Sequence, residues 1–494
     1  MGTYGEAATL GLNAGLDQEG GGGPTYPPVQ TGIPLALAAG NITTAQLTTA
    51  VRRLLRARLR LGMFDPPASL AYNNITYADV ASPANLALAE VAARKGMTLL
   101  VNKGAALPLA PKPPAGKRYA LLGPNANASY ILLGSYSDPG CCKAGIPTLL
   151  QELTPRVGGA LAYAPGCASP NCADDSGFAA AAAAAGSADT AAVILVLGMG
   201  NTQYACSGDH TDTSDCEAED HDRTTCALPG MQPALVAAVK AAMAPGVPLV
   251  AVLVHGGAFC IDPVTLGAFD AVLDAWYPGM RGGAAMADAL IGEFSPSGRS
   301  PVTWYASDAA LPADRGEMSP YPSAVSPGIT YRFYDNVPLG LPPPPFTFGE
   351  GLSYTTFAVE GVTAPPAANP CDAIPLSVTI ANTGSMDSEV VVQVFLAQPS
   401  LAGPAPRTRL VSFARVHVAA SGKAVIDLPS VQPSFRARVV DSTGENIYTL
   451  PGKRFADPGA LLFRVCLGEH NCHLKGGFGF NVSQAGPSKD LSTC

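Results

Sequence analysis

The sequence predicts an α/β protein in which a mostly parallel sheet, covered by helices on both faces, is followed by a β-sandwich. Between about residues 98 and 292, apolar runs of strand length alternate with helical segments, as in parallel strands joined by crossover helices. Beyond residue 351 the helical pattern ends, and apolar residues alternate with others in short runs separated by turns. That spacing is typical of a β-sandwich of about 110 residues.

The composition is that of a globular chain with room for about two or three domains. Apolar residues make up 47% of the 494 residues and charged residues 14%, so each domain can bury a core. The net charge of −8 and the pI of about 5.3 argue against a nucleic acid as partner. No stretch is long and apolar enough to cross a membrane, so we expect no membrane partner. No pattern predicts the oligomeric state.

The first 80 residues predict one well-defined helix. Residues 1–35 are rich in Gly and Pro and hold no complete domain. Thr43–Gln46 has the residue types of a capping box, so a helix should follow it and stop at Gly62. The arginines on this helix could bind a membrane surface, but on an acidic protein we interpret them as a solvated face. Residues 64–80 are interpreted as a linker.

A helix over about 82–96 precedes the alternating region. The expected strands lie at 98–101, 119–123, 193–197, 248–254 and 268–276. The expected helices lie at 176–186, 231–243 and 281–292, and Asp174 and Asp175 are predicted to cap the first of them. Residues 300–350 are rich in Pro and aromatic residues, which predicts a linker that packs against another part of the chain.

The most unusual stretch is Tyr204–Gln232, which separates an apolar strand from a helix. Loops between such elements usually have about two to six residues, and much longer ones tend to be functional or disordered. In an open α/β sheet the loop leaves the carboxyl end of a strand, where ligands bind. It carries Arg223, three cysteines and seven acids: Asp209, Asp212, Asp215, Glu217, Glu219, Asp220 and Asp222. A solvated acidic loop is the alternative, but disulfides would hold it in one shape.

The cysteines and glycosylation sequons favour an oxidising, secretory compartment. The chain has 12 cysteines and no CxxC pair that suggests zinc. Four sequons begin at Asn41, Asn74, Asn127 and Asn481. The first twenty residues do not form a signal peptide, so we expect either a cytosolic protein or a sequence whose true beginning is missing. The polar tail after residue 470 should fray unless Cys472 or Cys494 is bonded.

Several motifs, all in order, resemble those of glycoside hydrolase family 3, and in particular its β-xylosidase branch in plants and fungi. The resemblance covers about residues 5–470. Its motifs are Arg60–Asp65, Thr98–Lys103, Leu107–Leu109, Leu122–Asn125, Gly166-Cys167 with Cys172, Tyr277–Gly279, Gly282-Gly283, Pro296–Gly298, Pro301–Trp304, Thr330–Tyr334 and Phe348–Thr355. Cys167 and Cys172 resemble a cysteine pair of the xylosidase branch.

The resemblance implies a division of the chain into domains. It implies a C-terminal remnant of a (β/α)8 barrel, a linker, an α/β sandwich domain, a second linker, a fibronectin type III-like domain and a tail. These correspond to residues 1–65, 66–90, 91–310, 311–350, 351–470 and 471–494.

Glu217–Arg223, followed by Leu228-Pro-Gly230, resembles the acid/base segment of the family. Counted back from Asp222-Arg223, Glu219 falls on the general acid/base, and Glu217 is the second candidate. Asp220 stands where the family usually has Gly. A retaining glycosidase needs one carboxylic acid that protonates the leaving oxygen and then activates water.

The same mechanism needs a second carboxylate as nucleophile, about 5 Å from the first. In the family this Asp lies well upstream of a segment that Ala14–Asp17 resembles. We therefore expect the nucleophile strand and most of the barrel to be absent from these 494 residues, and the chain alone to be inactive. Asp17 and Glu19 do not match the nucleophile motif.

The resemblance implies an exo-acting β-xylosidase that releases xylose, with arabinose as a second candidate product, from xylan-derived oligosaccharides of the cell wall. It implies no cofactor and no metal, and an extracellular or cell-wall location. A non-catalytic glycan-binding or scaffolding protein is the alternative from another class. β-Glucosidase specificity is a third, which the spacing of Cys167 and Cys172 disfavours. A metal site of His210, His221, Cys206 and Cys216 with the loop acids stays open as a further alternative.

Overall fold

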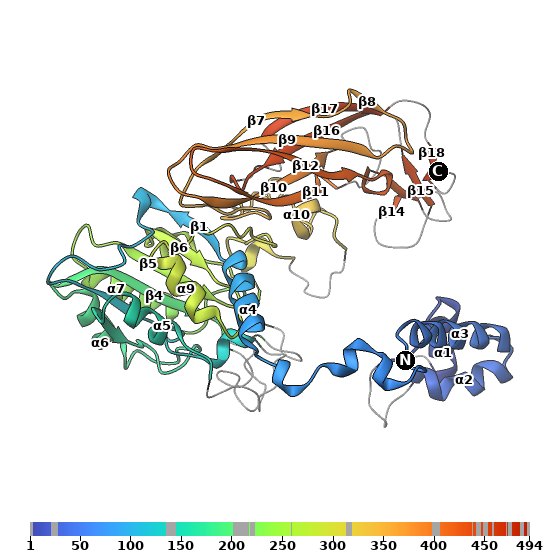
Figure 1. Ribbon diagram of the computed structural model, residues 1–494, viewed down its shortest axis with the longest axis horizontal. Helices are drawn as coiled ribbons and strands as arrows, with labels where there is room; N and C mark the ends of the chain where they lie inside the picture. Colours follow the sequence, from blue (N-terminus) through green and yellow to red (C-terminus); the bar gives the residue numbers. More distant parts are fainter. Residues whose placement is uncertain are drawn as a thin grey trace. The chain divides into compact units, whose positions relative to one another are not determined.

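The computed structural model describes residues 3–20, 28–134, 145–200, 217, 223–257, 259–312, 319–397, 406–436, 438–440, 446–447, 453–456, 459–470, 472, 477–484 and 489–491. The chain divides into two compact units, Met1–Asn85 and Leu86–Cys494 (Figure 1). Each unit has its own core and is described by itself. Within the described residues, no helix is both long and apolar enough to cross a membrane.

The first unit contains three helices: α1 (Tyr4–Asn13), α2 (Pro28–Ala38) and α3 (Thr44–Arg60). The predicted capping box of α3 is confirmed, because the Thr43 side chain accepts from the Gln46 backbone and the Gln46 side chain accepts from the Thr43 backbone. The helix ends at Arg60 with Leu61 as its C-cap residue, and Gly62 follows with a φ of +70°. Its five arginines are exposed, as expected of a solvated face.

Three short 3₁₀ turns follow α3 in the segment interpreted as a linker. They are η1 (Pro67–Ser69), η2 (Ala71–Asn74) and η3 (Tyr77–Asp79). None of them contains a buried residue. This segment therefore contributes no core of its own.

A six-stranded sheet forms the centre of the second unit, with the strand order β1-β6-β5-β4-β2-β3. The strands are β1 (Thr98–Asn102), β2 (Arg118–Leu122), β3 (Leu161–Ala164), β4 (Thr190–Gly198), β5 (Leu249–Val254) and β6 (Ala271–Asp274). Five of them run parallel, and β1 pairs with β6 in the antiparallel direction. The predicted mostly parallel sheet is confirmed.

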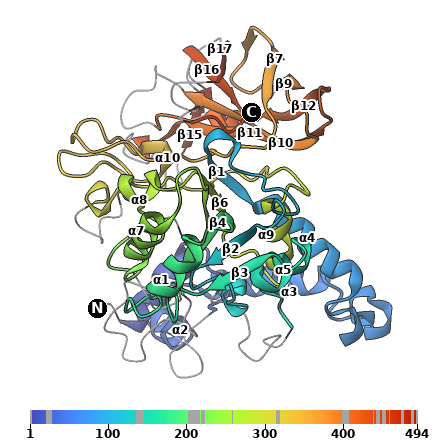
Figure 2. The ribbon, with the colours of Figure 1, turned by 90° about the vertical axis from the view of Figure 1, so that its left-hand side faces the viewer.

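Helices cover both faces of this sheet (Figure 2). One core contains residues of α4 (Pro83–Gly96), α5 (Leu149–Arg156) and α9 (Gly282–Leu290), and the other contains residues of α6 (Phe178–Ala185) and α7 (Gln232–Ala242). Successive residues of β4 alternate between them: Ile194 belongs to the first core and Leu195 to the second. Two buried faces explain why β4 and β5 read as continuous apolar runs.

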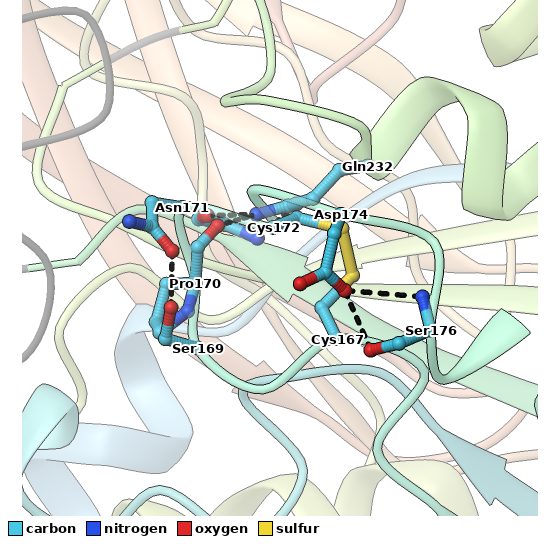
Figure 3. Close-up of a disulfide and its surroundings, with 9 residues drawn as sticks. Cys167, Ser169, Pro170, Asn171, Cys172, Asp174, Ser176 and Gln232 are labelled. Carbon is cyan, nitrogen blue, oxygen red and sulfur yellow. Dashed lines mark hydrogen bonds between the residues drawn. A yellow bond between two sulfur atoms is a disulfide. The ribbon is translucent and has the colours of Figure 1, made fainter.

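The predicted cap of α6 is wrong. The helix begins at Phe178 after Gly177, which makes no side-chain cap hydrogen bond. Asp174 instead accepts hydrogen bonds from the backbone and the hydroxyl of Ser176 (Figure 3). Asp residues often bond to the backbone two positions on, and here that local turn competes with capping.

The short helix α8 (Pro263–Gly267) lies between β5 and β6. The short helix α10 (Thr330–Phe333) follows the sheet and precedes the β-rich part. Its strands are β7 (Phe357–Thr363), β8 (Ala367–Ala368), β9 (Ile374–Asn382), β10 (Ser388–Ala397), β11 (Arg409–Val418), β12 (Lys423–Val431), β13 (Arg438–Val440), β14 (Asn446–Ile447), β15 (Lys453–Ala456), β16 (Gly459–Cys466), β17 (Phe478–Gln484) and β18 (Lys489–Asp490). They form sheets of five, three and four strands, ordered β11-β10-β16-β17-β8, β12-β9-β7 and β14-β13-β15-β18.

One apolar core joins the five-stranded and three-stranded sheets, with Val378 of β9, Val392 of β10 and Val465 of β16 among its fully buried members. The structure therefore contains the two packed, mostly antiparallel sheets expected of a β-sandwich, with β8 and β17 as the one parallel pair among the described strands of these two sheets. The tail of this part is tied at its start by a disulfide between Cys466 and Cys472.

The β-sandwich is fixed to the α/β part by buried and charged contacts. Arg299, which follows the α/β domain's Pro296–Gly298 turn, donates to the carbonyl oxygen of Leu467 at 2.6 Å. Arg415 of β11 donates to the carbonyl oxygen of Lys95 at 2.9 Å, and Glu389 of β10 accepts from the ammonium group of Lys95 at 2.8 Å. Burial, with Arg415 nearby, lowers the pKa of Arg299 to about 10.

Gly198 ends β4 in a conformation that a side chain could not adopt. Its φ is +142°, and an added Cβ would lie 1.9 Å from the carbonyl oxygen of Val254. We expect Gly198→Ala to lower the free energy of unfolding by about 1–3 kcal/mol more than Gly116→Ala. Gly116 is the matched control because its φ is also positive, +72°, yet nothing lies within 4 Å of its added Cβ. Urea denaturation followed by circular dichroism measures both, and equal losses would contradict the close approach.

Candidate active site

Three neighbouring strands end at the edge of the sheet that the long loop leaves. β4 ends at Gly198, β5 is followed by His255–Gly257, and β6 ends at Asp274. Since these strands are parallel neighbours, their carboxyl ends meet at one edge, which is where α/β sheets bind ligands. Of the predicted acid/base segment the structure describes Glu217 and Arg223. Glu219, Asp220 and Asp222 lie outside the described residues, as do His210, His221, Cys206 and Cys216 of the metal alternative.

Glu217 is held at this edge by donors on both carboxylate oxygens. Its Oε2 accepts from the backbone N–H of Gly256 at 2.5 Å and from the hydroxyl of Tyr277 at 3.0 Å. Its Oε1 accepts from the backbone N–H of Gly257 at 3.1 Å, and the Arg223 guanidinium lies 3.6 Å from the same oxygen. The side chain is 13% exposed. All of these partners donate, so the carboxylate acts here purely as an acceptor.

Tyr277 keeps its proton and therefore its donor role. Burial and the neighbouring Glu217 carboxylate raise the pKa of the Tyr277 phenol far above its usual range, although Arg223 acts in the opposite direction. A protonated phenol against a carboxylate gives a charge-assisted hydrogen bond, which is stronger than one between neutral groups.

Behind Glu217 lies a fully buried ion pair between His255 and Asp274. Nε2 of His255 is 3.0 Å from Oδ1 of Asp274, and both side chains have no exposed surface. Nε2 makes no hydrogen bond within the described residues, so its contact with Asp274 is an ion pair. On the other side of the ring, Nδ1 lies within hydrogen-bond distance of the carbonyl oxygen of Gly257. Both ring nitrogens thus lie near oxygens, an arrangement that favours the doubly protonated imidazolium.

The charge on His255 follows from a balance of two effects. Burial disfavours the imidazolium, but Asp274, with a smaller contribution from Glu217, outweighs burial and raises the pKa of His255. The rings of Phe259, Trp276 and Trp304 surround it, with centroids 4.4, 5.0 and 5.4 Å away. These rings exclude water and so strengthen the ion pair.

Gln232, the first residue of α7, holds the end of β4, from which the long loop leaves. Its buried side chain accepts from the N–H of Gly198 at 3.0 Å and donates to the carbonyl oxygens of Gly198 and Pro170 at 2.7 and 2.5 Å. Figure 3 shows Gln232 beside Pro170 and the disulfide between Cys167 and Cys172, the cysteine pair that the resemblance implied. One amide thus joins the end of β4 to a covalently closed turn.

The far end of the loop is fixed by a second disulfide, between Cys226 and Cys260. The N–H of Cys260 also donates to the carbonyl oxygen of Cys226 at 2.6 Å, and the N–H of Cys226 donates to Asp308 at 2.9 Å. Arg223 is three residues before Cys226, which the disulfide attaches to Cys260 in the segment that follows β5. Sequence spacing alone could not assign this pairing.

Asp17 and Glu19, which do not match the nucleophile motif, have structural partners in the first unit. Asp17 pairs with Arg53 of α3 at 3.1 Å. Glu19 accepts from the backbone N–H groups of Val29 and Gln30, both at 3.1 Å. Each carboxylate thus connects segments of the helical unit.

Sequence reasoning missed four residues of this site: His255, Gly256, Gly257 and Asp274. A signal was present, because His-Gly-Gly directly follows one buried strand and Asp ends the next. Polar residues at the carboxyl ends of neighbouring parallel strands are candidates for a site on position alone.

Comparison with known proteins identifies the chain. A profile of the glycosyl hydrolase family 3 C-terminal domain matches residues 97–354, which is more than half of the 494 residues. The chain therefore carries a domain that is typical of one class of glycosyl hydrolases. It belongs to glycoside hydrolase family 3.

Curated relatives include plant and fungal xylosidases. β-D-xylosidase 1 of Arabidopsis thaliana is 32% identical, and the match covers 95% of this chain and 58% of that protein. β-Xylosidase/α-L-arabinofuranosidase 1 of Medicago sativa subsp. varia is 33% identical over 85% of this chain and 53% of that protein. A probable exo-1,4-β-xylosidase of Aspergillus fumigatus is 35% identical over 82% and 49%. The chain thus spans 49–58% of the length of these relatives.

Solved structures share the fold. A family 3 exo-β-xylosidase in complex with a xylobiose aziridine probe has a TM-score of 0.76 and 24% identity, covering 99% of this chain and 59% of the other. A β-glucosidase from Listeria innocua in complex with isofagomine has a TM-score of 0.73 and 22% identity, covering 98% and 61%. At these identities the likeness concerns the fold alone.

The buried ion pair predicts how stability depends on pH. Because the pKa of His255 is raised on folding, its contribution is complete below the unfolded pKa of about 6.5 and is lost as pH rises through the folded value. We expect the free energy of unfolding to fall above about pH 6.5, by up to about 1.4 kcal/mol per pH unit. Urea denaturation from pH 6 to 9 measures this slope.

The control for this measurement is His417→Gln, since His417 lies in the β-sandwich with 62% of its side chain exposed. That variant should keep the slope, whereas His255→Gln should lose it. A wild-type stability that stays level or increases over this range would contradict a charged, buried His255.

Proposed function

We propose that this chain supplies the acid/base side of a retaining, exo-acting glycosidase that releases xylose, with arabinose as a second candidate, from xylan-derived oligosaccharides. The observation that carries the proposal is the set of contacts of Glu217. Its side chain binds residues that follow β5 and β6, and its backbone binds Gly200, two residues beyond β4. Family membership supports glycosidic bonds as the substrate. The xylosidase names of the curated relatives support pentose-containing substrates.

Glu219 is proposed as the general acid/base of this site. The motif match ranks it first, and the contacts of Glu217 support the same choice. Both oxygens of Glu217 already accept from fixed donors, so this carboxylate is not placed to deliver a proton. In the sequence Glu219 comes two positions after Glu217 and four before Arg223, and Cys226 is bonded to Cys260.

The proposed reaction proceeds in two displacements. Glu219 protonates the glycosidic oxygen while a second carboxylate attacks the anomeric carbon and forms a glycosyl-enzyme. Glu219 then removes a proton from water, which attacks the same carbon, releases the sugar and restores both carboxylates. In the family the second carboxylate lies on the barrel, and no residue of these 494 matches its motif.

The proposed location is the cell exterior or cell wall. The described residues include three disulfides, Cys167–Cys172, Cys226–Cys260 and Cys466–Cys472. Disulfides persist in oxidising compartments and are rare in the cytosol. Xylan-derived substrates of a cell wall would be met in the same compartment.

The proposal predicts that these 494 residues alone do not hydrolyse an aryl xyloside. The reason is that an acid/base without a nucleophile cannot form the glycosyl-enzyme. Release of 4-nitrophenol from 4-nitrophenyl β-xyloside, followed against a buffer blank, measures this. Turnover well above the blank would show that a nucleophile is present within these residues.

A second prediction concerns a polypeptide in which this chain follows a complete family 3 barrel. Glu219→Gln should lower kcat/KM for an alkyl xyloside by about 100–10,000-fold, because a poor leaving group must be protonated as it departs. A 2,4-dinitrophenyl xyloside needs no proton and should lose far less. Steady-state kinetics on both substrates give the ratio, and equal losses would remove Glu219 from the acid role.

A further inference from the structure

We propose that Glu217 is a positioning residue, whose carboxylate occupies an anion-binding turn at the sheet edge and so sets the place of the proton donor. This inference rests on the proposed role of Glu219 as the acid. It assigns to Glu217 a function distinct from proton transfer. It also assigns to His255–Gly257 a binding function, with an internal carboxylate as the ligand.

The turn after β5 has the features of a carboxylate site. Two successive backbone N–H groups, those of Gly256 and Gly257, point at the two oxygens of Glu217. The hydroxyl of Tyr277 adds a third donor, and the Arg223 guanidinium lies close by. Successive backbone N–H groups that converge on one point form anion-binding concavities, and donors on both oxygens fix the orientation of the carboxylate as well as its place.

Glycine is required at the first position of this turn. An added Cβ at Gly256 would lie 2.8 Å from the ring of Tyr277 and 3.2 Å from Oε2 of Glu217. At Gly257 an added Cβ would lie 3.2 Å from Oε1. Side chains at these positions would push the carboxylate away from the N–H groups that bind it.

The turn is held from behind, independently of Glu217. The buried imidazolium of His255 faces the carbonyl oxygen of Gly257 on one side and Asp274 of β6 on the other. Through His255, the Gly257 carbonyl group after β5 is thus connected to Asp274 at the end of β6. The donors are therefore already in place before the loop binds, and little further ordering of the turn is needed when Glu217 arrives.

The backbone of Glu217 is also hydrogen-bonded, so both its side chain and its main chain are held in place. Its N–H donates to the carbonyl oxygen of Gly200 at 3.1 Å, two residues beyond β4. The side chain is thus bound to the end of β5 while the backbone is bound to the end of β4. A proton donor two residues away would inherit this position, and small displacements of a catalytic group lower rates by about 100-fold.

The side chain must be a carboxylate for this role. Glutamine has nearly the same shape, but its amide group carries an NH₂ in place of one oxygen. Since both oxygens of Glu217 face N–H or O–H donors, either orientation of the amide would set donor against donor. Glu217→Gln therefore disturbs the position of the loop while it leaves the volume of the side chain almost unchanged.

The first test uses the 494-residue chain itself and supplies the missing anion from solution. In Glu217→Gly the turn is vacant, and sodium formate should occupy it. At about 100 mM formate we expect a rise in melting temperature of about 1–2 °C relative to sodium chloride of equal ionic strength. The wild-type chain, whose turn is filled, should not respond. A variant whose melting temperature is the same in both salts would overturn the proposal.

The second test measures catalysis in the polypeptide with a complete barrel. Glu217→Gln should lower kcat for an alkyl xyloside by about 100-fold, with a smaller loss for a 2,4-dinitrophenyl xyloside and little change in KM. Formate should restore part of the activity of Glu217→Gly, with xylose as the product. Glu360→Gln is the matched control, because Glu360 of β7 forms a surface ion pair with Lys423. Equal losses on both substrates would reduce Glu217 to a structural role.

Azide separates this inference from the proposed function. An enzyme without its acid/base accepts azide at the anomeric carbon of the glycosyl-enzyme, which forms a C–N bond and frees the nucleophile carboxylate. We expect xylosyl azide from Glu219→Ala and not from Glu217→Gly. Xylosyl azide from Glu217→Gly would overturn the positioning role. Its absence from Glu219→Ala, together with full activity of that variant, would overturn the proposed function instead.

Discussion

The hydrogen bonds from Gly256 and Gly257 to the carboxylate of Glu217 join the long loop to the sheet, and the rest of the site depends on them. A loop of this length loses much conformational entropy when it is fixed, at about 1–2 kcal/mol per ordered residue. Apolar burial cannot supply that free energy in a stretch so rich in acids. Hydrogen bonds to the Glu217 carboxylate and the disulfide at Cys226 attach the loop at these two described residues.

The sheet makes such an attachment possible because its strands are buried on both faces. β4 and β5 contribute alternate residues to two separate cores, so their ends are rigid. Gly198 lies so close to β5 that no side chain fits between the two strands. Polar groups can then be placed beyond the strand ends with little freedom to move, as His255 and Asp274 are. Apolar packing thus holds the strands in place. Electrostatic interactions then act between polar groups, such as His255 and Asp274, whose positions the strands determine.

The fold was largely predictable because its signals are local. Continuous apolar runs bounded by Gly or Pro gave β4 and β5, and residue types at fixed offsets gave the capping box of α3. The predicted cap of α6 was wrong for a reason that is also local, since Asp174 accepts from the backbone N–H of Ser176 two positions on, and spacing does not decide between that turn and a helix cap.

The site was predictable only in part because its contacts are not local. Glu217 meets Gly256 and Tyr277, which follow it by 39 and 60 positions, and no periodic pattern connects such residues. The disulfide between Cys226 and Cys260 spans 34 positions and was equally open. Motif spacing could rank Glu219 above Glu217, but only the donors around Glu217 give a physical reason for that order.

The most direct test of the account is a crystal structure of the barrel-containing polypeptide with an uncleavable xylobiose analogue in which sulfur replaces the glycosidic oxygen. The account predicts the carboxyl group of Glu219 within hydrogen-bond reach of that bridging atom, at about 3 Å, with Glu217 still bound to the N–H groups of Gly256 and Gly257. A structure in which Glu217 points at the bridging atom, or in which Glu219 faces away from the sugar, would contradict it.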